Sequence, residues 1–198
     1  MRIFLILLAL LSPWAAAKGP VMVYGDSLSA AYGLEIEQGW AWLLQDRLQD
    51  SGDDRDVINL SVSGETSGGG LARLPDALAR YQPSVLILEL GANDGLRGLS
   101  LQRLQRNLTT MIQAAQAIDA QVLLIGMRLP PSYGRRYVQA FEAVFPAVAE
   151  QTSAALMPFL LEAIALDESL FQEDRLHPTA QAQPILLDQV WQHLQPLL

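Results

Sequence analysis

The sequence carries a serine and a histidine in settings where each could take part in proton transfer. Ser27 lies in the run Gly25-Asp26-Ser27-Leu28-Ser29, and His177 follows Asp174 in the run Asp174-Arg175-Leu176-His177-Pro178. A serine hydroxyl becomes a nucleophile when a neighbouring base takes its proton. A histidine acting as that base needs a carboxylate or carbonyl on its other ring nitrogen to hold the required tautomer. Ser27, His177 and Asp174 are therefore candidates for nucleophile, base and orienting acid.

Two further polar segments, Ser63-Gly64-Glu65-Thr66 and Gly91-Ala92-Asn93-Asp94-Gly95, could supply hydrogen-bond donors. Acyl transfer needs such donors aimed at the oxygen that becomes negatively charged. The backbone N–H groups of Ser27 and Gly64 and the side-chain amide of Asn93 are the candidates for this oxyanion hole. Each segment also has a purely structural interpretation. Glu65 could be a first-turn helix acid, Asn93-Asp94-Gly95 an ordinary turn, and Asp174 a solvated loop acid.

The scarcity of other reactive residues narrows the chemistry. The chain has no cysteine, which excludes thiol nucleophiles, disulfides and cysteine-ligated metal sites. Its only lysine is Lys18, near the N-terminus, and its two histidines are His177 and His193. His193 lies on the flank of an apolar helical stripe, so we interpret it as a surface or packing residue. One remaining histidine is too few for a usual three-ligand zinc site, and we expect neither a metal nor an organic cofactor.

The elements that would position these residues alternate between short apolar runs and longer amphipathic stretches. The runs predict strands at 21–24, 57–60, 85–88, 122–125 and, more weakly, 154–157. Apolar residues at helical spacing predict helices at 40–48, 101–118 and 137–150, and a last helix that starts near Pro184. This alternation is typical of an α/β fold with a parallel sheet covered by helices on both faces. The ligand crevice of such a sheet lies beyond the carboxyl ends of its strands, where the candidate residues fall.

The composition argues against a nucleic-acid partner. The 198 residues include 13 Lys and Arg against 21 Asp and Glu, which gives a net charge of −8, and 51% of them are hydrophobic. An acidic chain lacks the positive field that supplies most nonspecific affinity for phosphate backbones. We therefore expect no nucleic-acid partner, and we expect a monomer that acts on a small molecule.

The N-terminal segment has the features of a secretory signal peptide. Arg2 precedes the apolar run at 3–11, and Ala15-Ala16-Ala17 resembles a cleavage site. Cleavage there would leave residues 18–198 as a single domain in the periplasm or the medium, with no stable membrane insertion. The alternative is an uncleaved anchor helix, which the short apolar run and Pro13 disfavour.

The four polar segments together resemble the blocks of the SGNH or GDSL hydrolases, with Ser27, Gly64, Asn93 and His177 at the matching positions. Longer runs resemble the secreted bacterial branch of this family known as acyl-CoA thioesterase I, lysophospholipase and arylesterase. These runs are 25–30, 70–75, 93–98 and 128–137, and the resemblance covers residues 20–198.

This resemblance implies a flavodoxin-like, three-layer α/β/α fold with a mostly parallel five-stranded sheet. It also implies Ser27 as nucleophile, His177 as base and Asp174 as its orienting acid. Ser27, Gly64 and Asn93 would form the oxyanion hole. The family's loop corresponding to 93–98 settles over bound acyl chains, which makes Leu96 a candidate substrate contact.

The sequence departs from the usual pattern of the family at three places. Glu65 stands where close relatives usually have Asp, Ala92 stands where a second Gly is common, and Arg175-Leu176 replaces Gly-Ile. A Cβ at residue 92 restricts φ where glycine would not, so we expect a less flexible loop at Asn93.

The function expected from the sequence is hydrolysis of esters and thioesters through an acyl-enzyme on Ser27. Substrates would be aryl esters, acyl-CoA or lysophospholipids. An esterase for O-acetylated carbohydrates is the alternative on the same scaffold, and the apolar Leu28, Leu96 and Leu129 beside the polar segments disfavour it.

Other classes of protein have less support in the sequence. An α/β-hydrolase would need a Gly-x-Ser-x-Gly elbow, which the chain lacks. A nucleotide-binding module could use Gly68-Gly69-Gly70, but that triplet has neither of the usual phosphate-loop spacings. The intact Ser27, Asp174 and His177 argue against a catalytically inactive binding protein.

Overall fold

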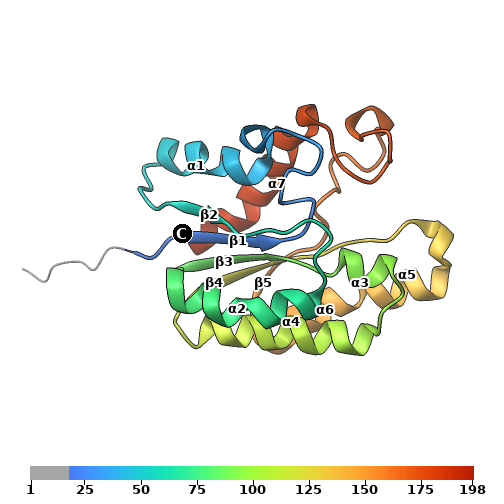
Figure 1. Ribbon diagram of the computed structural model, residues 1–198, viewed down its shortest axis with the longest axis horizontal. Coiled ribbons are helices and arrows are strands. Elements are labelled where there is room, and N and C mark those ends of the chain that lie inside the picture. The colour runs from blue at the N-terminus through green and yellow to red at the C-terminus, as the bar shows by residue number, and fades with distance from the viewer. Residues whose placement is uncertain (1–17) are drawn as a thin grey trace, which may run out of the picture.

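The computed structural model describes residues 18–198, and its centre is one five-stranded sheet (Figure 1). Every neighbouring pair of strands is parallel, and their order is β2-β1-β3-β4-β5. This is the order of flavodoxin-like doubly wound sheets, so the predicted fold class is confirmed. The strands are β1 (Val21–Gly25), β2 (Val57–Asn59), β3 (Val85–Glu89), β4 (Gln121–Ile125) and β5 (Ala155–Met157).

Helices cover both faces of the sheet, which explains why the central strands are apolar along their whole length. In Figure 1, α1 (Trp40–Asp50) and α7 (Gln183–Leu194) lie on one side of the sheet. The other side carries α2 (Ser67–Tyr81), α4 (Leu101–Gln116) and α6 (Val144–Thr152), with α3 (Ala92–Leu96) and α5 (Arg135–Glu142) beside them. Every residue of β1 and β3 is buried as a result.

The helix α2 is an element that the apolar spacing does not predict, because three glycines and Pro75 fall inside it. The Thr66 side chain caps its first turn by accepting the Gly69 N–H at 3.3 Å. A Cβ on Gly70 would lie 2.4 Å from Leu90 Cδ1, so a glycine is required for this close packing. The glycine run therefore serves contact between a helix and the sheet.

The single helix predicted at 137–150 is wrong, because two helices, α5 and α6, meet there at Ala143. Pro146 has no N–H to donate to the carbonyl of Glu142, so the helix cannot continue unbroken. The apolar spacing runs across the break because both helices pack the same way, with Phe141 and Phe145 in edge-to-face contact at 5.3 Å between ring centroids.

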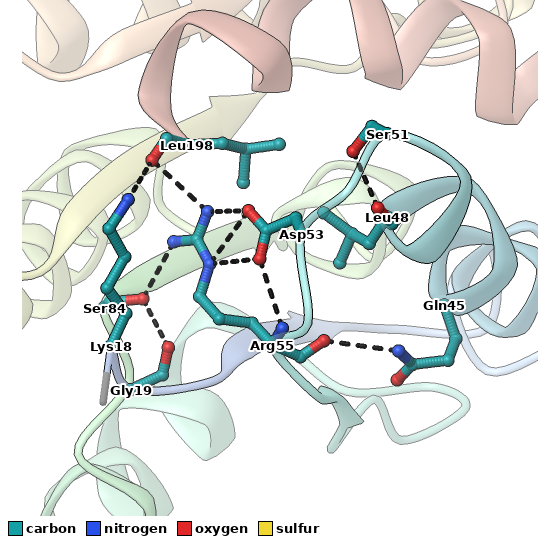
Figure 2. A network of polar contacts seen from close by, with 9 residues as sticks. All are labelled: Lys18, Gly19, Gln45, Leu48, Ser51, Asp53, Arg55, Ser84 and Leu198. Atoms are coloured by element: carbon teal, nitrogen blue, oxygen red, sulfur yellow. Dashed lines mark hydrogen bonds and ion pairs between the residues drawn. The ribbon is translucent and has the colours of Figure 1, made fainter.

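A buried arginine ties both ends of the described chain to the amino ends of the strands (Figure 2). The Arg55 side chain, 3% exposed, forms an ion pair with Asp53 and donates from Nη1 to Ser84 Oγ at 3.0 Å. Its Nη2 also donates to the Leu198 carbonyl at 3.3 Å, which Lys18 Nζ reaches at 2.8 Å. The hydrogen bonds from Arg55 hold the pKa of Asp53 below its ordinary value against the opposing effect of burial. This cluster lies at the opposite edge of the sheet from the candidate site.

The predicted signal peptide, residues 1–17, lies outside the described residues and stays a prediction. Between residues 18 and 198, none of the helices has both the length and the apolarity that crossing a bilayer requires.

Candidate active site

The four polar segments meet at the carboxyl ends of the strands. Ser27 follows β1, Asn93 lies in α3 directly after β3, and Asp174 and His177 lie in the loop that leads to α7. His177 Nε2 lies 2.9 Å from Ser27 Oγ, and His177 Nδ1 lies 2.6 Å from Asp174 Oδ2. The sequence separates Ser27 from His177 by 150 positions, and the fold brings them within hydrogen-bond distance.

Asp174 is held in place by hydrogen bonds from its own loop. Its Oδ1 accepts the backbone N–H groups of Leu176 at 2.9 Å and His177 at 3.0 Å. Partial burial would raise the pKa of Asp174, but hydrogen bonds from the backbone and ring of His177 and from Leu176 outweigh it and lower that pKa to about 2. Asp174 therefore remains a carboxylate at neutral pH and leaves His177 Nε2 facing Ser27.

The departure at Arg175 has a conformational consequence. Arg175 adopts a φ of 58°, the left-handed region that glycine enters without cost. A side chain at this position costs roughly 1–2 kcal/mol of backbone strain. The glycine that is usual at this position in the family would adopt this φ without strain, whereas Arg175 adopts it with strain.

The turn that carries Ser27 is fixed by the neighbouring Asp26, which is fully buried. Asp26 Oδ1 accepts the Leu28 N–H at 3.1 Å, and its Oδ2 accepts a hydrogen from Asn93 Nδ2 at 2.9 Å. Trp40 Nε1 donates to the Leu28 carbonyl at 3.1 Å from the other side. Asp26 therefore couples the orientation of the Asn93 amide to the turn that presents the Ser27 hydroxyl.

The three predicted oxyanion donors face one cavity of about 340 Å³. Among residues 18–198, the backbone N–H groups of Ser27 and Gly64 have no hydrogen-bond acceptor. Gly64 has a φ of 79°, a conformation that favours glycine, and its carbonyl accepts Arg97 Nη2 at 2.9 Å. The second hydrogen on Asn93 Nδ2 remains available because Asp26 accepts only one. The arrangement can stabilise a negatively charged oxygen beside Ser27.

The rest of the cavity is largely apolar. All three predicted substrate contacts, Leu28, Leu96 and Leu129, line it. The other apolar and aromatic lining residues are Tyr32, Ala92, Met127, Pro130, Leu161 and Leu176, and the polar Ser63 and Arg128 also line the cavity. A cavity with this lining suits an acyl chain whose carbonyl carbon lies at Ser27.

Of the structural interpretations, the one for Glu65 is wrong and the one for His193 finds support. Glu65 lies before Thr66, the N-cap of α2, and not in the first turn of that helix. Its carboxylate instead forms an ion pair with Arg73, accepting from Nε at 2.8 Å. His193 Nδ1 lies 3.0 Å from the Gln189 carbonyl on α7, one turn earlier in the helix, as expected for a residue with a packing role. Ala92 begins α3, a helical conformation that any residue adopts, so its Cβ is accommodated.

Sequence reasoning missed Glu89, the last residue of β3, which is completely buried below the nucleophile turn. Its Oε2 accepts the Asp26 N–H at 3.2 Å and the Ser29 hydroxyl at 2.8 Å, whereas Oε1 is buried without a partner. Burial, and then the negative charge of Asp26, raise the pKa of Glu89 well above its ordinary value. Its signal in the sequence is a lone acid that ends the apolar run Val85-Leu86-Ile87-Leu88.

The variant Glu89→Gln is expected to change how stability depends on pH. Because the folded protein favours protonated Glu89, this carboxyl should lower the wild-type free energy of unfolding as pH rises above about 4.5, by up to ~1.4 kcal/mol per pH unit. This loss adds to that from Asp26, whose pKa burial raises to about 6. Glutamine keeps the acceptor for Ser29 and removes this titration. Urea unfolding of both proteins between pH 4 and 8 measures the difference, and parallel curves across that range would refute the assignment.

No cluster of three or more His, Asp and Glu side chains within residues 18–198 is arranged to hold a metal ion. The hydrogen-bonded Ser27, His177 and Asp174, with the donors that face the same cavity, make up the candidate site.

Comparison with known proteins identifies the family. Residues 23–184 match the model of the GDSL-like lipase/acylhydrolase family. The chain is 52% identical to esterase TesA of Pseudomonas aeruginosa over 96% of this chain and 94% of that protein. It is 42% identical to thioesterase 1/protease 1/lysophospholipase L1 of Escherichia coli strain K12, over 96% of this chain and 90% of that protein. The crystal structure of the psychrotrophic esterase EstA from Pseudoalteromonas superimposes with a TM-score of 0.86 at 43% identity, over 90% of this chain and 98% of that one. The chain belongs to the GDSL-like lipase/acylhydrolase family.

Proposed function

We propose that this protein is a serine hydrolase that cleaves carboxylic ester and thioester bonds through an acyl-enzyme on Ser27. The observation that carries the proposal is the continuous hydrogen-bonded series from Ser27 Oγ to His177 at 2.9 Å and from His177 to Asp174 at 2.6 Å. The names of the relatives, which include esterase, thioesterase and arylesterase, support the same reaction class.

The reaction has two halves, and both use the same residues. His177 Nε2 takes the Ser27 proton while Oγ attacks the carbonyl carbon, and the oxyanion is stabilised by Gly64 N–H, Ser27 N–H and the Asn93 amide. His177 then gives the proton to the departing oxygen or sulfur, which leaves the acyl group on Ser27. A water molecule that loses its proton to His177 hydrolyses this ester and restores the free serine. Asp174 stabilises the positively charged imidazole in both halves.

The substrates we propose are aryl esters, acyl-CoA and lysophospholipids, because the apolar cavity suits an acyl chain. The test is a set of hydrolysis rates for aryl esters of increasing acyl length, an acyl-CoA, a lysophospholipid and an acetylated sugar. Rates that rise with acyl length support the proposal. Turnover of the acetylated sugar alone would favour the carbohydrate esterase instead.

The Asn93→Ala variant is expected to lose about 10²–10³-fold in kcat with little change in KM. The reason is that its amide hydrogen stabilises charge that is present only in the transition state, and one such donor is worth about 2.7–4 kcal/mol. Steady-state kinetics with one ester measure both constants. A rise in KM at constant kcat would mean that Asn93 binds the ground state instead.

We also propose that the mature protein begins at Lys18 and acts in the periplasm or the medium, on the basis of the Arg2 and Ala15-Ala16-Ala17 signals. N-terminal sequencing of the protein recovered from these fractions should give Lys18 first. Recovery of a species that starts at Met1 and remains in the membrane would refute it.

A further inference from the structure

The cavity contains an aromatic side chain that the proposed chemistry does not use. Tyr32 is half exposed, with 50% of its surface accessible, and its ring lies against His177 with 4.3 Å between centroids and a 37° tilt. It lines the same cavity as Ser27 and His177, as does the half-exposed Leu176 beside the histidine in the chain. The exposed part of this ring is therefore available to contact a substrate bound next to His177.

Backbone hydrogen bonds connect Tyr32 to the segment of Ser27 and to the loop of His177. Its N–H donates to the Ser27 carbonyl at 3.2 Å, and its own carbonyl accepts Gln172 Nε2 at 2.8 Å. Gln172 in turn receives support from the histidine loop, because its N–H donates to the His177 carbonyl at 2.8 Å. These hydrogen bonds hold the backbone of Tyr32 relative to the nucleophile and the base, and the ring itself contacts His177.

The two parts of an ester lie in different places relative to Ser27. Leu96, Leu129 and Leu161, which form much of the apolar wall, come from segments that follow β3, β4 and β5. The alcohol or thiol part must lie near His177 Nε2, because this nitrogen gives it the proton on departure. Two residues of the cavity adjoin that histidine. The Tyr32 ring contacts the His177 ring, and Leu176 directly precedes His177 in the sequence.

We propose that Tyr32 and Leu176 form a subsite for the leaving group, and that this subsite favours aromatic alcohols and thiols. The inference rests on the proposed function, since it concerns the group that an acyl-enzyme releases. The exposed part of the Tyr32 ring supplies a flat apolar surface for offset or edge contact with a second ring. Leu176 covers the leaving group from the side of the histidine loop.

The test uses three butyrate esters that share one acyl group. Benzyl butyrate and cyclohexylmethyl butyrate have rings of similar size, and only the first is aromatic, whereas ethyl butyrate has no ring. Wild type should prefer benzyl over both other esters in kcat/KM. In Tyr32→Ala the benzyl to ethyl ratio should fall about three- to tenfold, the size of one aromatic contact. Tyr32→Phe should keep the ratio, and Leu176→Ala should lower kcat/KM for both ring-bearing esters relative to ethyl butyrate.

A matched control is Trp42→Ala, which removes an aromatic side chain of equal exposure, 50%, that does not line this cavity. Its ester ratios should equal those of wild type. The breakdown of the common butyryl-enzyme should proceed at the same rate in Tyr32→Ala as in wild type, because the leaving group has already departed.

Two results would overturn the subsite. Equal losses for all three esters in Tyr32→Ala would mean that the ring only positions His177, and unchanged ratios would mean that the leaving group does not touch it. Absence of turnover of every ester by wild type would instead refute the proposed function itself. The two failures are therefore distinguishable.

Discussion

The Ser27→Ala variant is expected to lose nearly all turnover, roughly 10⁶-fold in kcat, the loss seen when a serine protease loses its nucleophile. The loss is large because no bond to the acyl group can form without Oγ, while the oxyanion donors at Gly64 and Asn93 remain and give a small residual rate. The measurement is the steady-state rate with one aryl ester, at enzyme concentrations high enough to detect that residual rate.

Covalent labelling supplies the second readout for this variant. An organophosphonate should add one adduct to the wild-type protein on the peptide that contains Ser27, and none to Ser27→Ala. Ser51→Ala, at the end of α1 on the opposite edge of the sheet, should be labelled and active like wild type. A chelator should leave activity unchanged. Full turnover in Ser27→Ala, or loss of turnover on chelation, would contradict the mechanism.

His177→Ala is expected to be almost as severe, roughly 10⁶-fold in kcat, because the nucleophile and its base act as one unit. Asp174→Ala should lower kcat less, about 10⁴-fold. Without the carboxylate, only a fraction of the His177 side chains has the tautomer and orientation that accept the Ser27 proton. These rates should be measured with the same aryl ester and compared at one pH near neutrality. His193→Ala is the matched control, because its ring contacts the Gln189 carbonyl on α7 and does not line the cavity.

The dependence of kcat/KM on pH separates the two histidines further. Only a neutral imidazole can accept the Ser27 proton, so the rate should fall on the acid side in wild type and His193→Ala alike. Asp174 does not add a step in this range, since its hydrogen bonds keep its pKa at about 2. A folded His193→Ala protein that lost turnover while His177→Ala kept it would reverse the assignment of the base.

The candidate site could be located from the sequence because parallel strands impose one geometry on many chains. Polar residues that follow β1 and β3 must lie at the same edge of the sheet, so Ser27 and Asn93 could be expected together. Asp174 and His177 form their own local contacts across three positions, which a short motif is able to specify. That Ser27 and His177, 150 positions apart, act together was expected only from the resemblance to a known family.

The contacts that hold the catalytic residues in place could not be predicted, because they join residues that are distant in sequence. Glu89 and Tyr32, for example, belong to no motif recognised in the sequence. Glu89 meets Asp26 across 63 positions, and a buried acid at a strand end resembles any other acid in the sequence. The contact between Tyr32 and His177 depends on a turn in which Ala31 adopts a φ of 56°. The helix α2 was missed for a related reason, since the close packing of Gly70 on Leu90 is a tertiary requirement that overrides helix propensity.

The cluster around Arg55 places residues 18 and 198 together at the edge of the sheet that faces away from Ser27 (Figure 2). A protein tethered to a bead or an electrode through either of these residues would therefore present its cavity outward, toward the solution. The same adjacency means that a short peptide could join residue 198 to residue 18 and that new ends could be opened in an exposed loop elsewhere. The fold thus lends itself to immobilisation and to circular permutation without rearranging the residues that surround the ester.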